Sequence, residues 1–206
     1  MFGKIKEKLK SHSGLKKLVL WTIASPYGAR PRLWIRLFIN PILHTRNGRI
    51  RIMARLDVFP FNHFVLGKHS FVEDFCTVNN GVGDVYIGTR SRIGLGSTVI
   101  GPISIGDDVH IAQNVVLSGL NHDYEDVTRT IAAQGVNTST IVIENDVWIG
   151  ANSVITAGVT IGTHSVVAAG SIVTKSMPPY SVSAGIPAKL MKKYDFDKKE
   201  WIKVKD

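Results

Sequence analysis

The chain has 206 residues, of which 44% are hydrophobic and 20% charged, a composition typical of a soluble protein with one main domain and an appendage. Its single cysteine excludes an intrachain disulfide and is consistent with a reducing compartment, so we expect a cytoplasmic protein in which Cys76 is a small core residue. No stretch of the sequence approaches the ~20 apolar residues that a membrane-spanning helix needs.

The net charge of +9 is concentrated at the beginning of the chain. Residues 1–55 hold 13 of the 25 Lys and Arg residues and one acidic residue, Glu7, so this segment carries +12 and the remainder −3. Residues 4–20 interleave lysine with aliphatic residues and predict an amphipathic helix, and residues 33–39 form a second apolar segment. We treat residues 1–55 as one basic N-terminal segment.

Two interpretations of this basic segment stay open. Aromatic residues beside arginines suit the headgroup layer of an anionic membrane, which would make the segment a peripheral membrane contact. Alternatively, the segment is a helical cap on the rest of the chain, and its charges are simply solvated. A nucleic acid partner is not expected, because the main body of the chain is acidic. The aromatic residues concerned are Trp21, Tyr27 and Trp34.

The main body has a six-residue period. Neither a helix nor a simple alternating strand generates this spacing; it predicts a solenoid of short parallel strands, with three hexads and about 18 residues per coil. The aliphatic residue of each hexad and the residue two before it should point inward. The small residue that follows, such as Gly88, suits either an unusual backbone angle or close packing. The aliphatic residues are Ile87, Ile93, Val99, Ile105, Ile111 and Leu117, and then Ile143, Ile149, Ile155, Ile161, Val167 and Val173.

The period is less regular before residue 85. Val65, Val72, Val78 and Val85 are separated by seven, six and seven residues, which indicates an imperfect first coil that caps the solenoid. We therefore assign residues 56–186 to the solenoid and residues 187–206 to a C-terminal tail with a short helix.

Residues 118–140 interrupt the period and are too polar to continue the stacking, so they should leave the solenoid as a protruding loop. Long loops on a rigid scaffold commonly carry function. His122 is the one histidine of this loop, between Asn121 and Asp123. A neutral imidazole is a suitable general base near neutral pH, although a histidine in an acidic loop can equally be a solvated surface residue.

Four strings in this order carry a family resemblance: ISIGDDVHIAQNVVL, NHD, IENDVWIGANSVITAGVTIG and AAGSIVTKSMPPYSVSAGIPAKLM. Together they resemble the hexapeptide-repeat acyltransferase superfamily, in its galactoside, maltose and exopolysaccharide O-acetyltransferase branch. The close resemblance covers residues 103–193. It implies an all-β, left-handed parallel β-helix, a homotrimer, and acetyl-CoA bound without a metal in a groove between neighbouring subunits, with the loop closing over it.

The resemblance also implies roles for individual residues. The family's catalytic histidine corresponds to His122, which would deprotonate the acceptor in a direct transfer without a covalent intermediate. The oxyanion donor corresponds to Ala151, which offers only its backbone N–H where some relatives have serine. Asp123, Glu125 or a backbone carbonyl would orient His122. The positions implied for the cofactor are Trp148, Ala151, Ala169, Thr174 and Lys175 along pantetheine and adenine, and Lys189 and Lys192 near the CoA phosphates.

The region before Ile103 is more similar to acetyltransferases of exopolysaccharide and capsule clusters, which implies a saccharide or glycolipid acceptor at the inner membrane face. The alternatives are a xenobiotic or amino-sugar N-acetyltransferase, a zinc hydratase of the γ-carbonic anhydrase type, and a non-enzymatic scaffold. The hydratase needs three converging imidazoles, whereas the loop contains one, and His110 and His164 lie on the solenoid.

Overall fold

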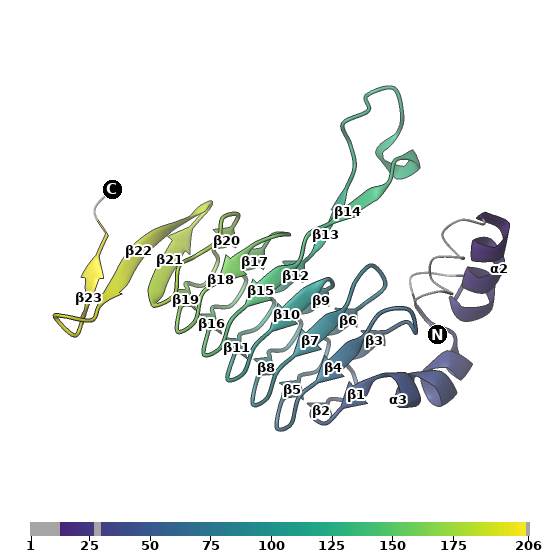
Figure 1. The fold of residues 1–206 in the computed structure, drawn as a ribbon, viewed down its shortest axis with the longest axis horizontal. Coiled ribbons are helices and arrows are strands. Elements are labelled where there is room, and N and C mark those ends of the chain that lie inside the picture. Colours follow the sequence, from purple (N-terminus) through teal and green to yellow (C-terminus); the bar gives the residue numbers. More distant parts are fainter. Residues whose placement is uncertain (1–12, 27–29, 205–206) are drawn as a thin grey trace.

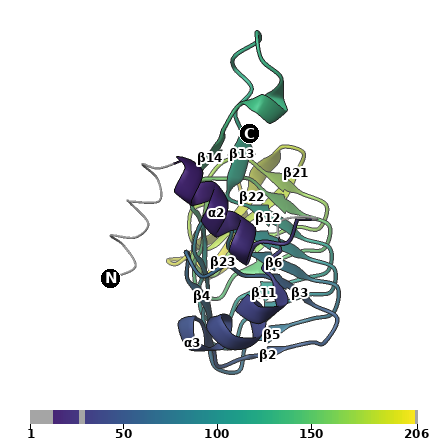
Figure 2. The same cartoon turned by 90° about the vertical axis from the view of Figure 1, so that its right-hand side faces the viewer.

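The structure is a computed structural model in which residues 13–26 and 30–204 are described. These residues form a parallel β-solenoid, which Figure 1 shows from the side and Figure 2 nearly along its axis. Six coils of three strands each stack so that equivalent strands pair in parallel and form three faces. The predicted fold is confirmed as a parallel β-helix.

The strands of each face are hydrogen-bonded in coil order. Face 1 consists of β1 (Thr45–Arg46), β4 (Phe64–Leu66), β7 (Val85–Ile87), β10 (Ile103–Ile105), β15 (Ile141–Ile143) and β18 (Thr160–Ile161). Face 2 consists of β2 (Arg49–Ile50), β5 (Phe71–Val72), β8 (Arg92–Ile93), β11 (His110–Ile111), β16 (Trp148–Ile149) and β19 (Val166–Val167). Face 3 consists of β3 (Arg55–Asp57), β6 (Thr77–Asn79), β9 (Thr98–Ile100), β12 (Val116–Ser118), β17 (Val154–Ile155) and β20 (Ile172–Val173). We call the turns between them corner 1–2, corner 2–3 and corner 3–1.

The core is the stack of hexad side chains. Ile93 is in register with Ile111, and Ile111 with Ile149, so each aliphatic residue packs on its equivalent one coil away. Every aliphatic residue of the predicted period is at most 2% exposed, and the residues two positions earlier, such as Ser97 and Val109, are buried as well. Stacking identical positions buries apolar surface continuously along the axis, which is the main stabilising contribution in such a fold.

Close packing, and not an unusual backbone angle, explains the small residue after each aliphatic one. A Cβ atom on Gly88 would lie 2.5 Å from the carbonyl oxygen of Gly106 in the next coil. The positive φ angles occur two residues later in the turn, at Arg90 (56°) and Asp108 (57°). Of the two explanations given by the sequence, only the steric one holds for Gly88.

The first coil begins earlier than predicted, at Thr45 and not at residue 56. Its strands β2 and β3 carry aliphatic residues at the inward positions, Ile50 and Leu56, which are six residues apart and in register with Val72 and Val78. The prediction missed this coil because Arg46, in register with Leu66, interrupts the period before Ile50. Val65 was assigned one residue out of register: it is half-buried, whereas Phe64 and Leu66 on either side of it are fully buried. A shift of one residue moves a side chain to the other side of a strand.

The N-terminal segment caps the first coil. It contains α2 (Ser13–Ile23), a short π-helix η1 (Ile35–Ile39) and α3 (Asn40–Leu43). Ile23 and Ile35 pack with Phe59 in a small apolar cluster separate from the main core. None of the described helices is long and apolar enough to cross a membrane. Residues 4–12 of the predicted amphipathic helix and Tyr27 lie outside the described residues.

The predicted C-terminal helix is wrong. After β21 (Ser181–Gly185), the chain forms β22 (Ala188–Asp195) and β23 (Glu200–Lys203), which extend face 2 as antiparallel strands. The edge of β21 offers backbone partners to this segment. Ring contacts add to the hairpin, with Tyr194 at 5.1 Å from Phe196 and 5.5 Å from Trp201 between centroids. Tertiary pairing of this kind overrides local helix preference.

Candidate active site

The loop of residues 118–140 leaves the solenoid at corner 3–1, between coils 4 and 5, and projects well beyond it (Figure 1). It is an ordered hairpin: β13 (Leu120–His122) pairs antiparallel with β14 (Val136–Thr138), and a 3-10 turn η2 (Ile131–Ala133) lies between them. The Gln134 side chain braces its far end by donating to the carbonyl oxygen of Asp126 at 3.0 Å. The hairpin therefore presents side chains from a defined backbone.

His122 ends β13, opposite Val136, with its side chain exposed. Neither predicted orienting carboxylate contacts it. Asp123 accepts a hydrogen bond from the Asn137 amide at 2.7 Å, and Glu125 accepts one from the backbone N–H of Tyr124 at 3.0 Å. Within the described part of the chain, no hydrogen bond or ion pair involves the imidazole, so it is available to a partner from outside the chain.

Corner 2–3 of coils 4 to 6 carries the two alanines that the sequence singled out. Ala151 and Ala169 occupy equivalent positions one coil apart, and Gln113 is the equivalent residue of coil 4. The Asn152 N–H donates to the carbonyl oxygen of Gln113 at 3.0 Å, and the Gly170 N–H to that of Ala151 at 2.8 Å, so the turns stack in line. We call this row, formed by Gln113, Ala151 and Ala169, the bare corner.

The backbone N–H groups of the bare corner have no partner among the described residues. The adjoining residues are small, namely Ala112, Gly150 and Ala168, and none carries an oxygen that could reach a neighbouring turn. Three free donors therefore line one edge of the solenoid. The sequence analysis missed Gln113; the signal was the lack of Asp, Glu, Asn, Ser or Thr at the first two turn positions of these coils.

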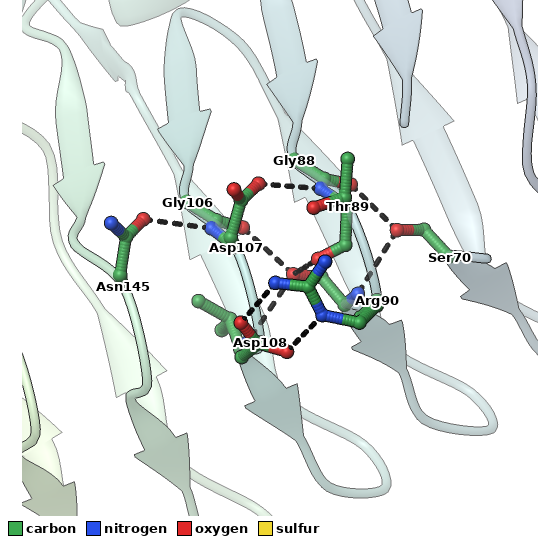
Figure 3. A network of polar contacts seen from close by, with 10 residues as sticks. Ser70, Gly88, Thr89, Arg90, Gly106, Asp107, Asp108 and Asn145 are labelled. Carbon is green, nitrogen blue, oxygen red and sulfur yellow. Dashed lines mark hydrogen bonds and ion pairs between the residues drawn. The ribbon is translucent and has the colours of Figure 1, made fainter. Parts of the chain in front are cut away.

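In coils 3 and 4, the equivalent N–H groups at corner 1–2 donate to side chains of the next coil (Figure 3). The Thr89 N–H donates to Asp107 Oδ1 at 2.6 Å, and the Asp107 N–H to Asn145 Oδ1 at 2.8 Å. Arg90 pairs with Asp108 through two contacts of 2.6 Å, and this guanidinium lowers the pKa of Asp108. We call this row of turns the polar corner.

Trp148 stands on the outer side of face 2, beside His110 in the parallel register, and is 54% exposed. A cavity of about 480 Å³ lies next to it, lined also by Asp108 and Asp146. Trp148 therefore does not close a corner of the solenoid. Its ring is available on the face that leads to Ala151.

The remaining cofactor positions divide between two places. Thr174 and Lys175 follow β20 at corner 3–1, the corner from which the loop with His122 also leaves. Lys189 and Lys192 are exposed on β22, at the C-terminal end of face 2. Face 3 separates His122 from the bare corner. One chain by itself therefore does not bring the histidine and the donor row together.

Histidines elsewhere do not gather around His122. His164 Nδ1 lies 2.5 Å from Asp146 Oδ2 at the polar corner, and His110 is on face 2. Among residues 13–26 and 30–204, no group of three His, Cys, Asp or Glu side chains is placed to hold a metal ion.

Comparison with known proteins identifies the family. The family model for the hexapeptide repeat of succinyl-transferase matches residues 84–118 and 140–175. The galactoside O-acetyltransferase of Escherichia coli K12 is 37% identical over 142 residues, covering 67% of this chain and 68% of that protein. The chain belongs to the hexapeptide-repeat acyltransferase superfamily, in its O-acetyltransferase branch. The family expected from the sequence motifs is therefore confirmed, and the protein is an acyltransferase.

Two further relatives of this acyltransferase are informative. A putative lipopolysaccharide biosynthesis O-acetyltransferase of Escherichia coli K12 is 34% identical over 108 residues, covering 49% of this chain and 55% of its own length. A solved galactoside acetyltransferase in complex with coenzyme A superimposes with a TM-score of 0.51 at 29% identity, covering 79% of this chain and 72% of that one. The relatives are thus named for acetyl transfer, and one binds coenzyme A.

Proposed function

We propose that this acyltransferase moves the acetyl group of acetyl-CoA to a hydroxyl group of a saccharide. The observation that carries the proposal is the pairing of an unpartnered imidazole, His122, on a projecting hairpin with a row of free N–H donors at the bare corner. These are the two elements that acyl transfer requires, a base for the acceptor and a donor for the oxyanion.

In the proposed reaction, His122 accepts the hydroxyl proton while the hydroxyl oxygen attacks the thioester carbonyl carbon. The carbonyl oxygen becomes an oxyanion, which accepts a hydrogen bond from the Ala151 N–H. The carbon–sulfur bond then breaks, and the CoA thiolate takes the proton from the imidazolium. A positioned general base contributes roughly 10²–10⁴-fold to such a rate. An oxyanion donor contributes roughly 10²–10³-fold.

The chemistry of the bare corner suits the cofactor. The pantetheine arm of CoA carries two amide carbonyls, and the N–H groups of Gln113, Ala151 and Ala169 are unused donors in a line. Trp148 offers an apolar face to the same arm, and Thr174 and Lys175 are assigned to its adenine end. The phosphates would be held by Lys189 and Lys192 as point charges. No metal enters this proposal.

A complete site needs a second copy of the chain, because face 3 lies between His122 and the bare corner. We therefore assign the protein as a homotrimer in which the hairpin of one subunit reaches the bare corner of its neighbour. Apolar side chains exposed along corner 2–3 of the first three coils support this, because a surface of this kind is commonly covered by another protein. They are Ile52, Met53, Phe75 and Leu95.

The decisive experiment measures CoA thiol release from acetyl-CoA with a panel of saccharide acceptors. We expect His122→Ala to lower kcat at least about a hundredfold, with unchanged circular dichroism and oligomeric state. The control is His63→Asn, an exposed histidine outside the proposed site, which should retain wild-type rates. Equal rates for His122→Ala and wild type would refute the base assignment. Transfer to amines but not to hydroxyls would instead identify an amino-sugar acetyltransferase.

The N-terminal segment supports a saccharide acceptor attached to, or made at, the inner face of the cytoplasmic membrane. One side of the segment packs on the first coil, and the other side leaves large apolar residues exposed, including Leu33 (64%), Phe38 (67%) and Ile42 (81%). Cations accompany them, with Arg32 stacked 5.2 Å from the centre of the Trp21 ring. Apolar anchors beside cations fit an anionic lipid surface. The cap and the peripheral membrane contact are thus two sides of one segment.

Vesicle co-sedimentation tests this contact. Vesicles rich in phosphatidylglycerol should sediment the protein, and phosphatidylcholine vesicles should not. Phe38→Asp should abolish sedimentation, whereas Val127→Asp, at an even more exposed apolar residue on the loop, should leave it unchanged. Sedimentation that survives Phe38→Asp would remove the segment from the proposal.

A further inference from the structure

A cavity of about 500 Å³ lies on the outer side of face 2 at the first three coils, away from the bare corner. Three arginines line it, Arg49 on β2, Arg51 just after β2 and Arg92 on β8. The remaining lining is small, polar or aromatic, and none of it is acidic: Asn47, Gly48, His69, Ser70 and Phe71.

Phe71 holds these guanidinium groups close together. Arg51 stacks 5.5 Å from the centre of its ring and Arg92 stacks 5.8 Å from it, while Arg49 is its neighbour in the parallel register. Cation–π contacts stabilise the position of each arginine but do not neutralise its charge. The ring therefore serves as a platform that gathers positive charge at one spot.

Little negative charge opposes the arginines. Arg49 and Arg51 form no ion pair with any described residue, and Arg92 approaches Glu73 only at 4.0 Å. The other oxygen of Glu73 already accepts the Leu95 N–H at 2.9 Å. Like charges held together in this way repel one another unless an anion binds between them. Guanidinium groups bind phosphate with paired, charge-assisted hydrogen bonds.

The cavity shares a row of outward side chains with the proposed active site. Arg92 is in register with His110, and His110 with Trp148. Adjacent strands are about 4.8 Å apart, so the Arg92 and Trp148 backbones are separated by roughly 10 Å. Lys189 and Lys192, assigned to the CoA phosphates, lie on β22, on the other side of Trp148. Face 2 is thus cationic at both ends, and CoA accounts for one of them.

We infer that the cavity of Arg49, Arg51 and Arg92 binds the phosphate or diphosphate group of a phosphorylated saccharide acceptor. The inference rests on the proposed acetyl transfer, because it places the acceptor on the N-terminal side of Trp148 and the cofactor on the C-terminal side. A diphosphate links a sugar to a nucleoside or to a lipid carrier, and the cavity recognises the group that both share. The separation of roughly 10 Å between the Arg92 and Trp148 backbones leaves room for one sugar ring between the Arg92 end of the cavity and Trp148.

Binding of inorganic pyrophosphate, measured by calorimetry, tests the cavity alone. Arg49→Gln and Arg92→Gln should each weaken binding about tenfold or more, because each removes hydrogen bonds to a charged group. The matched control is Arg90→Gln, which removes an equal charge from a guanidinium already paired with Asp108. It should bind pyrophosphate within about twofold of wild type. Equal binding by all four proteins would overturn the inference, and so would displacement of pyrophosphate by CoA, since that assigns the cavity to the cofactor.

Kinetics with one sugar in three forms then identifies the source of the phosphate. The forms are a methyl glycoside, a nucleoside-diphosphate sugar and a prenyl-diphosphate sugar in detergent. Arg92→Gln should raise KM about tenfold for a diphosphate form without changing kcat, and leave the methyl glycoside unaffected. An equal change for all three forms would contradict the inference. Failure of the proposed function is distinguishable, because transfer would then be absent while pyrophosphate binding still depended on Arg92.

Discussion

The polar corner and the bare corner are formed by the same hexad turn, but their backbone N–H groups differ in whether a side chain accepts a hydrogen bond from them. At the polar corner, the N–H groups of Thr89 and Asp107 are bonded by side chains one coil further on. At the bare corner, the N–H groups of Ala151 and Ala169 have no described partner. The backbone geometry is the same, so the difference arises from which side chains occupy the first two turn positions.

Corner 2–3 itself changes along the axis. In coil 3, the N–H of Leu95, which is the residue equivalent to Ala151, donates to Glu73 at 2.9 Å. A carboxylate of coil 2 therefore accepts from this donor in coil 3, whereas the equivalent donors of Gln113, Ala151 and Ala169 have no described partner. A solenoid that leaves these surface donors to solvent forgoes the hydrogen bonds that side chains supply at the polar corner.

The largest expected effect comes from closing the bare corner. Ala169 stands to Ala151 as Asp107 stands to Thr89, one coil further on, so Ala169→Asp should bring a carboxylate to the Ala151 N–H. We expect loss of acetyl transfer by roughly 10²–10³-fold, with thermal stability equal to or above that of wild type. Steady-state kinetics and thermal unfolding measure the two quantities. Thr163→Asp, at the equivalent turn position of the polar corner in the same coil, is the control; full activity of Ala169→Asp would mean that the free donor has no role.

The sequence predicted the core of the solenoid because the period of six is a direct record of inward-facing positions. It did not predict the first coil, where Arg46 occupies an aliphatic position before Ile50 and Leu56, nor the C-terminal hairpin, whose strands depend on the edge of β21. The hairpin was missed because strand pairing at an edge leaves no periodic signal in eight residues.

The candidate site could be predicted only in part, because several of its features depend on contacts between residues distant in sequence. Motifs singled out His122 and Ala151 as candidates, but they could not show that Asp123 is bonded to Asn137, since that contact depends on the register of β13 and β14. The free N–H row depends on side chains in neighbouring coils, and the arginine cavity on the stacking of strands distant in sequence. In the proposed trimer, the partner of His122 belongs to another copy of the chain, and a sequence carries no distance between copies.

Replacing one glycine at each corner with alanine distinguishes the steric cost of an added Cβ atom from the conformational cost of a positive φ angle. A Cβ on Gly88, at the polar corner, would meet the Gly106 backbone at 2.5 Å, whereas one on Gly170, beside the bare corner, would meet nothing within 4 Å. Gly88→Ala should therefore lower the free energy of unfolding by about 3 kcal/mol through overpacking. Gly170→Ala should lower it by about 1 kcal/mol, because only its φ of +71° is unfavourable for alanine. Urea unfolding checks both, and the reverse order would show that coil spacing is not fixed by these contacts.

One backbone N–H of the solenoid donates to a histidine side chain, and this hydrogen bond depends on pH. His44 Nδ1 accepts the Phe64 N–H at 3.3 Å, which it can do only while neutral, and burial, aided by Arg46 and His63, lowers its pKa from 6.5 to about 4. Between pH 6.5 and 4, His44 is protonated in the unfolded chain but neutral in the folded chain. The free energy of unfolding should therefore fall as pH drops from 6.5 to 4. The loss is at most about 3 kcal/mol.

Chemical unfolding of wild type and His44→Gln across this pH range measures the effect as a difference. The difference is required because burial raises the pKa of Asp57, whose protonation favours the folded state and works in the opposite direction. His110→Gln, an exposed histidine on face 2, should retain the wild-type slope. If the free energy of unfolding changes with pH in the same way for wild type and His44→Gln, then His44 does not cause the loss of stability at low pH.

The smallest expected effect measures what one closed donor contributes. Asp107→Ala removes the oxygen that accepts the Thr89 N–H and so converts one turn of the polar corner into a bare one. The freed N–H is at the surface and can bond to water, so the loss of unfolding free energy should be about 1 kcal/mol, measured at fixed protein concentration. Asp107→Asn keeps an acceptor oxygen and should lose less than half of that. Because the turns are equivalent, this value also estimates the unfolding free energy that a bonded N–H at Ala151 or Ala169 would contribute. If Asp107→Ala causes no measurable loss, the free donors of the bare corner cost no stability and need no functional explanation.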